Sequence, residues 1–197
     1  MSLHLEKQML FYGQYHHNTV NVTIHIVCVP VILMTTLLLL SNIPSVPLPP
    51  WLSVPNLPLS ISTVGAVLYS TLYILMEPVA GGLVAPLIVG GTAYANHLTS
   101  TYGATANYWA GGLWVVSWIA QFVGHGKFEG RAPALLDNIV QALFLAPFFV
   151  WFEVLFFFGY RPDLKRRIDK SVEEEVQKFR SSKEKGENGT ANGSKSS

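Results

Sequence analysis

The hydrophobic residues of this chain gather into long uninterrupted runs that are separated by short polar stretches. Runs of this length predict helices that cross or enter a membrane. Four of them predict crossings, over residues 19–40, 61–76, 79–95 and 108–123. A fifth run, residues 134–158, carries several polar side chains and an internal proline. We expect this run to form an embedded or re-entrant helical piece that breaks near that proline and lines a cavity with its polar face.

The segments between the runs have patterns of their own. Residues 4–17 predict a short amphipathic helix that lies on the membrane surface, and Asn18 can cap the helix that follows. Residues 41–60 hold six prolines and no charge, which excludes regular helix and predicts an extended loop on the membrane. Glu77 and the proline after it end the second long helix, and residues 98–107 form a polar, uncharged connection.

Composition indicates a membrane-embedded body with a solvated tail. Half of the 197 residues are hydrophobic and only 13% are charged, and the mean hydropathy is +0.34. Between Gln8 and Gly126 the only charged residue is Glu77, whereas the chain after Arg161 is rich in charged and small polar residues. We therefore expect an all-α polytopic membrane bundle. Its expected parts are a membrane-embedded catalytic domain, a charged cytosolic helix and a disordered tail, at residues 1–160, 161–180 and 181–197.

The basic residues predict how the bundle is oriented. The loops at 41–60 and 96–107 contain no Lys or Arg, whereas a basic run begins at Lys165. With four crossings, the positive-inside rule places both termini in the cytosol; five crossings would use the charges less well. A net charge of +1 gives no overall field that would attract nucleic acid, and the single cysteine, Cys28, cannot form an internal disulfide.

Two polar stretches, residues 15–25 and 121–133, carry most of the chemically active side chains. In the four-crossing topology, His16 and His25 lie near the cytosolic end of the first crossing, and His125 lies at the same end of the fourth. Imidazole is the commonest metal ligand, and polar groups inside a membrane are costly unless they are paired or ligated. The pattern predicts a metal site, with hydrogen-bonding interfacial histidines as the alternative.

Two further residues bear on the ligand set. Glu129 lies four residues after His125, so on a helical turn the two would form a His/carboxylate set that suits Fe(II) or Zn(II). The glycines around them weaken this helix, and Glu129 could instead hold an imidazole or pair with Arg131. His97 follows the third run and falls at the opposite end of the topology, so a site with four histidines conflicts with four simple crossings.

The two stretches resemble the fungal 2-hydroxy fatty acid dioxygenase family over roughly residues 8–165. The first motif reads Tyr15-His16-x-Asn18-x-x-Asn21-x-x-x-His25, with Thr19 where the family usually has proline. The second reads Gln121-Phe122-Val123-Gly124-His125-Gly126-x-Phe128-Glu129-x-Arg131-x-Pro133-Ala134-Leu135-x-Asp137-Asn138. The resemblance implies an Fe(II)-dependent enzyme of the endoplasmic reticulum membrane that uses O₂ to shorten long-chain 2-hydroxy fatty acids by one carbon. This reaction belongs to phytosphingosine degradation and yields odd-chain fatty acids.

The resemblance also implies roles for single residues. The implied iron ligands are His16, His25, His97 and His125. We expect Glu129 and Arg131 to be catalytic: the planar guanidinium fits the substrate carboxylate, although Arg131 could equally pair with Glu129 or a lipid phosphate.

We expect Asn18, Asn21 and Asp137 to support the ligands from behind, although capping explains Asn18 about as well and Asp137 could instead hold its own loop. The acyl chain would lie between the apolar helices, entering from membrane lipid. A histidine-box di-iron enzyme generally uses about eight histidines, and this chain has six. A non-catalytic membrane scaffold or lipid-binding protein is the alternative outside the enzymes.

Overall fold

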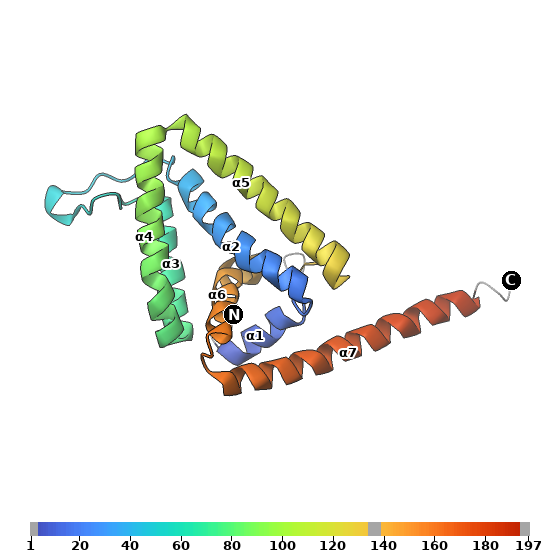
Figure 1. The fold of residues 1–197 in the computed structure, drawn as a ribbon. Helices are drawn as coiled ribbons and strands as arrows, with labels where there is room; N and C mark the ends of the chain where they lie inside the picture. Colours follow the sequence, from blue (N-terminus) through green and yellow to red (C-terminus); the bar gives the residue numbers. More distant parts are fainter. Residues whose placement is uncertain (1–3, 134–138, 194–197) are drawn as a thin grey trace.

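The computed structural model describes residues 4–133 and 139–193, and every long element in this part of the chain is a helix (Figure 1). The predicted all-α class is confirmed. The elements are α1 (Leu5–Gly13), α2 (Thr19–Leu40), the 3₁₀ turn η1 (Pro50–Leu52), α3 (Ile61–Met76), α4 (Pro78–Tyr102), α5 (Ala104–Val123), the π-helical turn η2 (Gly124–Glu129), α6 (Ile139–Phe157) and α7 (Pro162–Gly193).

The helices pack in pairs around α2 and α6. Helix α3 packs along α4, and both α5 and α6 pack against α2 (Figure 1). Helices α1 and α7 contact each other and cross the end of the molecule where α2 begins (Figure 1). The start of α2 and the end of α5 are therefore neighbours, as the four-crossing topology predicts.

By length and composition, α2 and α4 are the two helices that could each cross a membrane, within the residues searched. Helices α6 and α7 add a third candidate only if the pair, bent by 119°, counts as one span, and α3 is apolar but shorter. A helical membrane protein therefore fits, with fewer candidate spans than the four crossings expected. Helix α5 is long enough but is not a candidate span, because its tryptophans, Asn107 and Gln121 lower its mean hydropathy.

Two long helices, α2 and α3, have the predicted bounds, whereas α4 ends later and α5 begins earlier than predicted. The Asn18 side chain caps α2 by accepting the N–H groups of Val20 and Asn21, at 2.9 and 3.4 Å. The connection expected over residues 98–107 is wrong, because α4 continues to Tyr102 and Gly103 alone separates it from α5. Gly103 makes this turn at φ 51°, a backbone conformation that suits glycine.

The expected break of α6 near Pro147 is also wrong, because the helix is continuous from Ile139 to Phe157. A proline leaves the carbonyl four residues earlier without its N–H partner. In α6 this is the carbonyl of Leu143, and it accepts the Tyr69 hydroxyl at 3.1 Å. The Tyr73 hydroxyl donates to the next carbonyl, that of residue 144, at 2.7 Å. Tyr69 of α3 therefore satisfies the carbonyl that the proline exposes, and Tyr73 adds a hydrogen bond to the next one.

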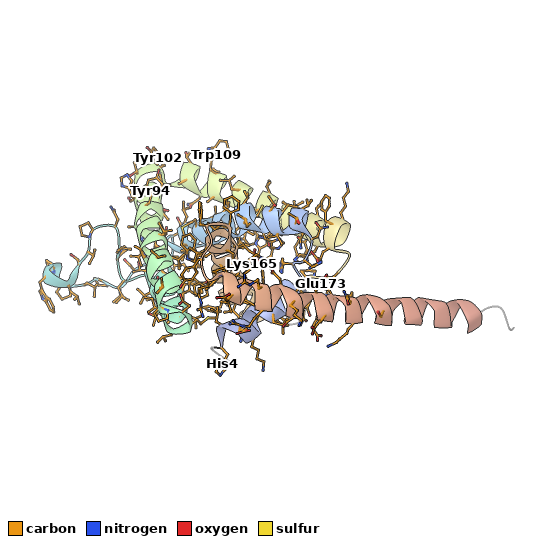
Figure 2. All side chains as sticks on the ribbon, turned by 60° about the horizontal axis from the view of Figure 1, so that its bottom comes forward. His4, Tyr94, Tyr102, Trp109, Lys165 and Glu173 are labelled. Atoms are coloured by element: carbon orange, nitrogen blue, oxygen red, sulfur yellow. The ribbon has the colours of Figure 1, made fainter. Side chains whose placement is uncertain are left out.

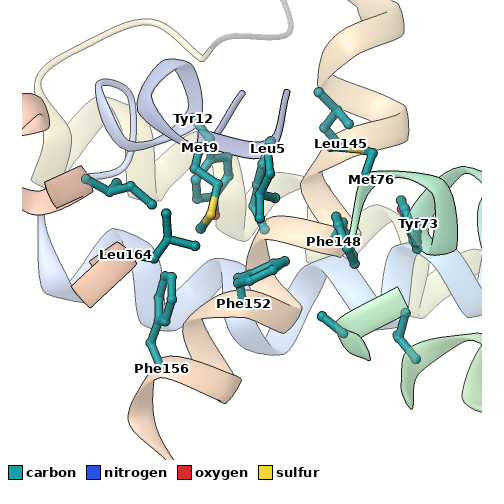
Figure 3. Packing of buried hydrophobic residues seen from close by; sticks show 14 of the residues in the cluster. Leu5, Met9, Tyr12, Tyr73, Met76, Leu145, Phe148, Phe152, Phe156 and Leu164 are labelled. Atoms are coloured by element: carbon teal, nitrogen blue, oxygen red, sulfur yellow. The ribbon is translucent and has the colours of Figure 1, made fainter. Parts of the chain in front are cut away.

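The apolar core surrounds α6. Its buried aromatic side chains pack against residues of α1, α3 and α7 (Figure 3). The labelled members are Leu5, Met9, Tyr12, Tyr73, Met76, Leu145, Phe148, Phe152, Phe156 and Leu164. This packing fixes α1 against the bundle, although nine residues of helix would be marginal alone.

The two ends of the molecule differ in character. Exposed Tyr94, Tyr102 and Trp109 gather where α4 meets α5, whereas Lys165 and Glu173 lie on α7 away from that end (Figure 2). Aromatic residues favour membrane interfaces and basic residues favour the cytosolic side. A charged helix is present after Arg161, as expected, and it continues past residue 180 to Gly193. The division of the chain into domains stays a prediction.

Candidate metal centre

Three histidines from two distant parts of the chain meet beside the start of α2. The ring centroids of His16 and His25 lie 4.4 Å apart, and the ring centroid of His125 lies 4.8 Å from that of His16 and 4.9 Å from that of His25. All three side chains are buried, and one nitrogen of each lies within 4.8 Å of the others. Within the searched residues, this is the single group of His, Cys, Asp and Glu side chains close enough to hold a metal ion.

Backbone carbonyls one helical turn earlier orient two of the three rings. The Nδ1–H of His25 donates to the Asn21 carbonyl at 2.9 Å, and the Nδ1–H of His16 donates to the Tyr12 carbonyl at 3.0 Å. A carbonyl can only accept, so each Nδ1 carries the proton and each Nε2 keeps its lone pair. This support of a ligating imidazole through its second nitrogen is common in protein metal sites.

The third histidine is carried by a π-helical turn that lies close against α2. Gly124 opens this turn, and a Cβ on it would collide with the Asn21 side-chain oxygen. Glycine therefore permits the approach that brings His125 to the other two rings. The Nδ1 of His125 is buried without a hydrogen-bond partner in the described structure. A buried, unpartnered imidazole nitrogen fits a metal ligand and is costly otherwise.

Glu129 ends the π-turn and ties it to the beginning of α2. Its carboxylate accepts the backbone N–H groups of His17 and Asn18 and the side-chain amide of Asn21, each at 3.0 Å. A carboxylate is stabilised at a helix N-terminus by the helix dipole. Glu129 lies outside the group that could hold a metal, so the structure uses this residue to position the segments that carry His25 and His125.

Arg131 lies apart from the triad. Its Nη1 donates to the Gln14 carbonyl at 2.9 Å, and its guanidinium stacks on Tyr15 at 3.7 Å and Phe179 at 4.5 Å. The guanidinium thus joins the α1–α2 connection to α7 and does not line the cavity described below. Asp137, expected to support a ligand, lies outside the described residues.

The structure does not bring His97 to the triad. This residue is exposed near the end of α4, where its ring lies 6.5 Å from that of Tyr94. Helix α5 begins beside that end and finishes just before His125. Its 20 residues span about 30 Å. The structure therefore keeps His97 apart from the other three histidines, and its role as a ligand stays a prediction.

Burial keeps the imidazoles neutral. It holds the pKa of His16 well below its usual value, and the neighbouring His25 and His125 lower that pKa further. Burial, and then the neighbouring His25, lowers the pKa of His125 to about 4. Both rings are therefore neutral at physiological pH, which is the form that binds a metal.

An apolar cavity of about 190 Å³ ends at the triad. Its lining comes from α1, α2, α3, α5, α6 and Pro133. The polar members of the lining other than the triad are Tyr12, Thr36, Tyr69, Trp118 and Gln121. The sequence-based interpretation assigned no role to Tyr12 and Gln121. A signal did exist for Gln121, which lies four residues before His125, about one helical turn. Tyr12 also lies four residues before His16, but α1 ends at Gly13, so helical periodicity does not relate these two residues.

Comparisons with known proteins identify the family of the chain. A family model described as "2-hydroxy-palmitic acid dioxygenase Mpo1-like" matches residues 2–158. The 2-hydroxy-palmitic acid dioxygenase MPO1 of Saccharomyces cerevisiae is 38% identical over 173 residues, which cover 87% of this chain and 91% of the yeast protein. No solved structure matches the chain significantly. The predicted family is confirmed: this chain belongs to the Mpo1-like family of 2-hydroxy-palmitic acid dioxygenases.

Proposed function

We propose that this protein is an Fe(II)-dependent dioxygenase that converts long-chain 2-hydroxy fatty acids into the acid one carbon shorter. The observation that carries the proposal is the buried triad of His16, His25 and His125 at the end of an apolar cavity. The 38% identity to a protein named 2-hydroxy-palmitic acid dioxygenase supports the substrate class.

The triad fits an iron ion. Imidazole suits iron as well as zinc, and three protein ligands leave positions open for substrate and O₂. Two nitrogens that share an ion with bonds of about 2.1 Å lie at most about 4.2 Å apart. Three nitrogens that share one ion lie closer together, about 3.0–3.4 Å apart at angles of about 90–110°, so the rings, whose nitrogens lie within 4.8 Å of one another, would have to close by up to about 1.8 Å. When bound, Fe(II) supplies a centre that a 2-hydroxy carboxylate can chelate and at which O₂ can be reduced.

The side chains around the triad determine what can react there. The carbonyls of Tyr12 and Asn21 hold the Nδ1 protons of His16 and His25, so both Nε2 lone pairs would be available to an ion. The apolar walls hold the first part of the acyl chain and keep bulk water out. In the balanced reaction the C1–C2 bond breaks, C2 becomes the new carboxyl carbon, and O₂ is the oxidant. The products are the shortened acid, CO₂ and one water.

The substrate is proposed to enter from the bilayer. Phe122 of α5 and Leu143 of α6 line the cavity and are 49% and 42% exposed, so its wall reaches the surface between these helices. A fatty acid dissolved in membrane lipid would meet this wall directly. The endoplasmic reticulum and cytosolic termini belong to the same proposal. The basic run from Lys165, on the side of the molecule where α2 begins, supports that orientation.

Product analysis tests this function. The protein is purified anaerobically in detergent, supplied with Fe(II), and given 2-hydroxypalmitate labelled at C1 together with O₂. We expect pentadecanoate and one labelled CO₂ for each substrate consumed, and no turnover of palmitate, which lacks the hydroxyl. Iron-loaded protein that binds 2-hydroxypalmitate without forming pentadecanoate would overturn the dioxygenase proposal and favour a lipid-binding protein.

A further inference from the structure

The cavity contains hydrogen-bond donors that nothing in the described structure satisfies. The Tyr12 hydroxyl, the Trp118 indole N–H and the Gln121 side-chain amide nitrogen are buried without partners. Tyr12 is 6% exposed and Gln121 is 7% exposed, and all three side chains line the cavity. Buried donors are almost always paired in folded proteins, because leaving them unpaired is costly. Three such donors along one cavity therefore indicate a polar group that binds there.

Two of these donors, Tyr12 and Gln121, lie near the triad. The Tyr12 ring stacks on the His16 ring, with centroids 3.9 Å apart and planes 11° from parallel. Gln121 lies one helical turn before His125, on the face that α5 turns toward α2. Trp118 lies three residues before Gln121 on the same face. Donors from two different helices thus flank the proposed iron.

The proposed substrate brings a carboxylate to this place. No Lys or Arg occurs among the residues that line the cavity, and the Arg131 guanidinium is held elsewhere by Gln14, Tyr15 and Phe179. A carboxylate oxygen that does not chelate the metal therefore needs neutral donors. An amide NH₂ and a phenol O–H supply them, and hydrogen bonds to a charged acceptor are stronger than those between neutral groups.

We propose that Gln121 and Tyr12 bind the carboxylate of the 2-hydroxy acid and thereby place its C1–C2 bond over the triad. The proposal rests on the function proposed above. On this proposal, these two residues make the protein bind free fatty acids in preference to their esters, which lack the negative charge. Such selection suits an enzyme whose cavity opens to a membrane full of esterified acyl chains.

Equilibrium binding tests the proposal without turnover. Labelled 2-hydroxypalmitate and its methyl ester are each bound, without O₂, to full-length protein in detergent, both metal-free and Fe(II)-loaded. The variants are Gln121→Leu, which removes the amide, and Tyr12→Phe, which keeps the stacked ring and removes one oxygen. The control is Ser70→Ala, because the Ser70 hydroxyl is also buried without a partner but lies outside the cavity.

We expect wild-type protein and Ser70→Ala to prefer the free acid over the ester. Each cavity variant should lose about ten- to hundredfold in affinity for the acid, as expected for a lost hydrogen bond to a charged group, with little change for the ester. Equal losses for acid and ester would show a structural role and overturn the proposal, as would unchanged acid binding. If Gln121→Leu does not fold, Tyr12→Phe decides the matter.

Turnover separates this proposal from the proposed function. If wild-type protein forms pentadecanoate while both variants match its kcat and KM, the carboxylate assignment is overturned and the dioxygenase stands. If wild-type protein forms no pentadecanoate, the function itself fails. Iron content serves as an internal check, because neither side chain belongs to the triad and both variants should load iron as the wild type does.

Discussion

Replacing Glu129 with alanine should disconnect the two segments that carry His25 and His125. The carboxylate accepts three hydrogen bonds at the start of α2, from two backbone N–H groups and from the Asn21 side chain. The bond to the exposed N–H of His17 is replaced by water at little cost. Asn21 is fully buried, so the loss of this charged acceptor dominates the change in stability, although the amide also donates to the Tyr15 carbonyl at 3.4 Å.

The expected magnitudes follow from these contacts. A hydrogen bond between a charged acceptor and a buried amide contributes about 1.5–3 kcal/mol, and a carboxylate at a helix N-terminus adds about 0.3–1 kcal/mol. Glu129→Ala should therefore destabilise the fold by about 2–4 kcal/mol. Loss of a group that orients metal ligands typically lowers metal affinity about 10- to 100-fold, and we expect that range here.

The assay is a metal titration of the metal-free protein, paired with thermal unfolding followed by tryptophan fluorescence. Glu129→Gln should fall between wild type and Glu129→Ala, because it keeps one acceptor oxygen and loses the charge. Glu173→Ala, which removes an exposed carboxylate on α7, is the matched control and should change neither quantity. Glu129→Ala with wild-type metal affinity and stability but no turnover would refute this reasoning and restore a direct role in the chemistry.

Three further predictions follow from the same geometry. The metal-free protein should lose stability as pH falls from about 6.5 to about 4, because the pKa of His125 is about 4 in the fold and the unfolded chain takes up its proton first. The loss of stability due to His125 reaches about 3 kcal/mol at the acidic end, and His16, whose pKa is also lowered, acts in the same direction. Thermal unfolding measured across this pH range would show constant stability if the burial argument were wrong. Gly124→Ala should push the Asn21 side chain aside and weaken metal binding about tenfold or more in the titration above, whereas unchanged affinity would mean that η2 can shift freely. Tyr73→Phe should destabilise the fold by about 0.5–1.5 kcal/mol without changing metal affinity, because it removes the hydrogen bond from the Tyr73 hydroxyl to the residue 144 carbonyl of α6; a change in affinity would link α6 to the triad.

Local signals in the sequence were sufficient to predict the first two long helices. Asn18 provides a cap and the apolar run behind it defines α2, and Glu77 followed by proline ends α3. The end of α4 could not be read in the same way, because Thr99 and Ser100 look like loop residues. In the helix, the Thr99 hydroxyl donates to the carbonyl of Ala95, which keeps the polar turn helical.

The convergence of His16, His25 and His125 follows from topology, because the start of α2 and the end of α5 lie at the same end of the bundle. The close contact of the three rings depends on tertiary packing that residue spacing in the sequence cannot predict, such as the approach of Gly124 to Asn21. For the same reason, the expected roles of Arg131 and Glu129 came from their chemistry alone. The packing of α1, α2 and α7 decides which groups hydrogen-bond to the Arg131 guanidinium and to the Glu129 carboxylate.

Iron content in histidine variants tests the central claim most directly. Wild type, His125→Ala and His97→Ala are purified anaerobically, loaded with Fe(II), freed of excess metal and analysed for iron per chain. We expect close to one iron in wild-type protein and in His97→Ala, and almost none in His125→Ala. Equal iron in all three proteins, or loss of iron with His97→Ala alone, would contradict the three-histidine centre.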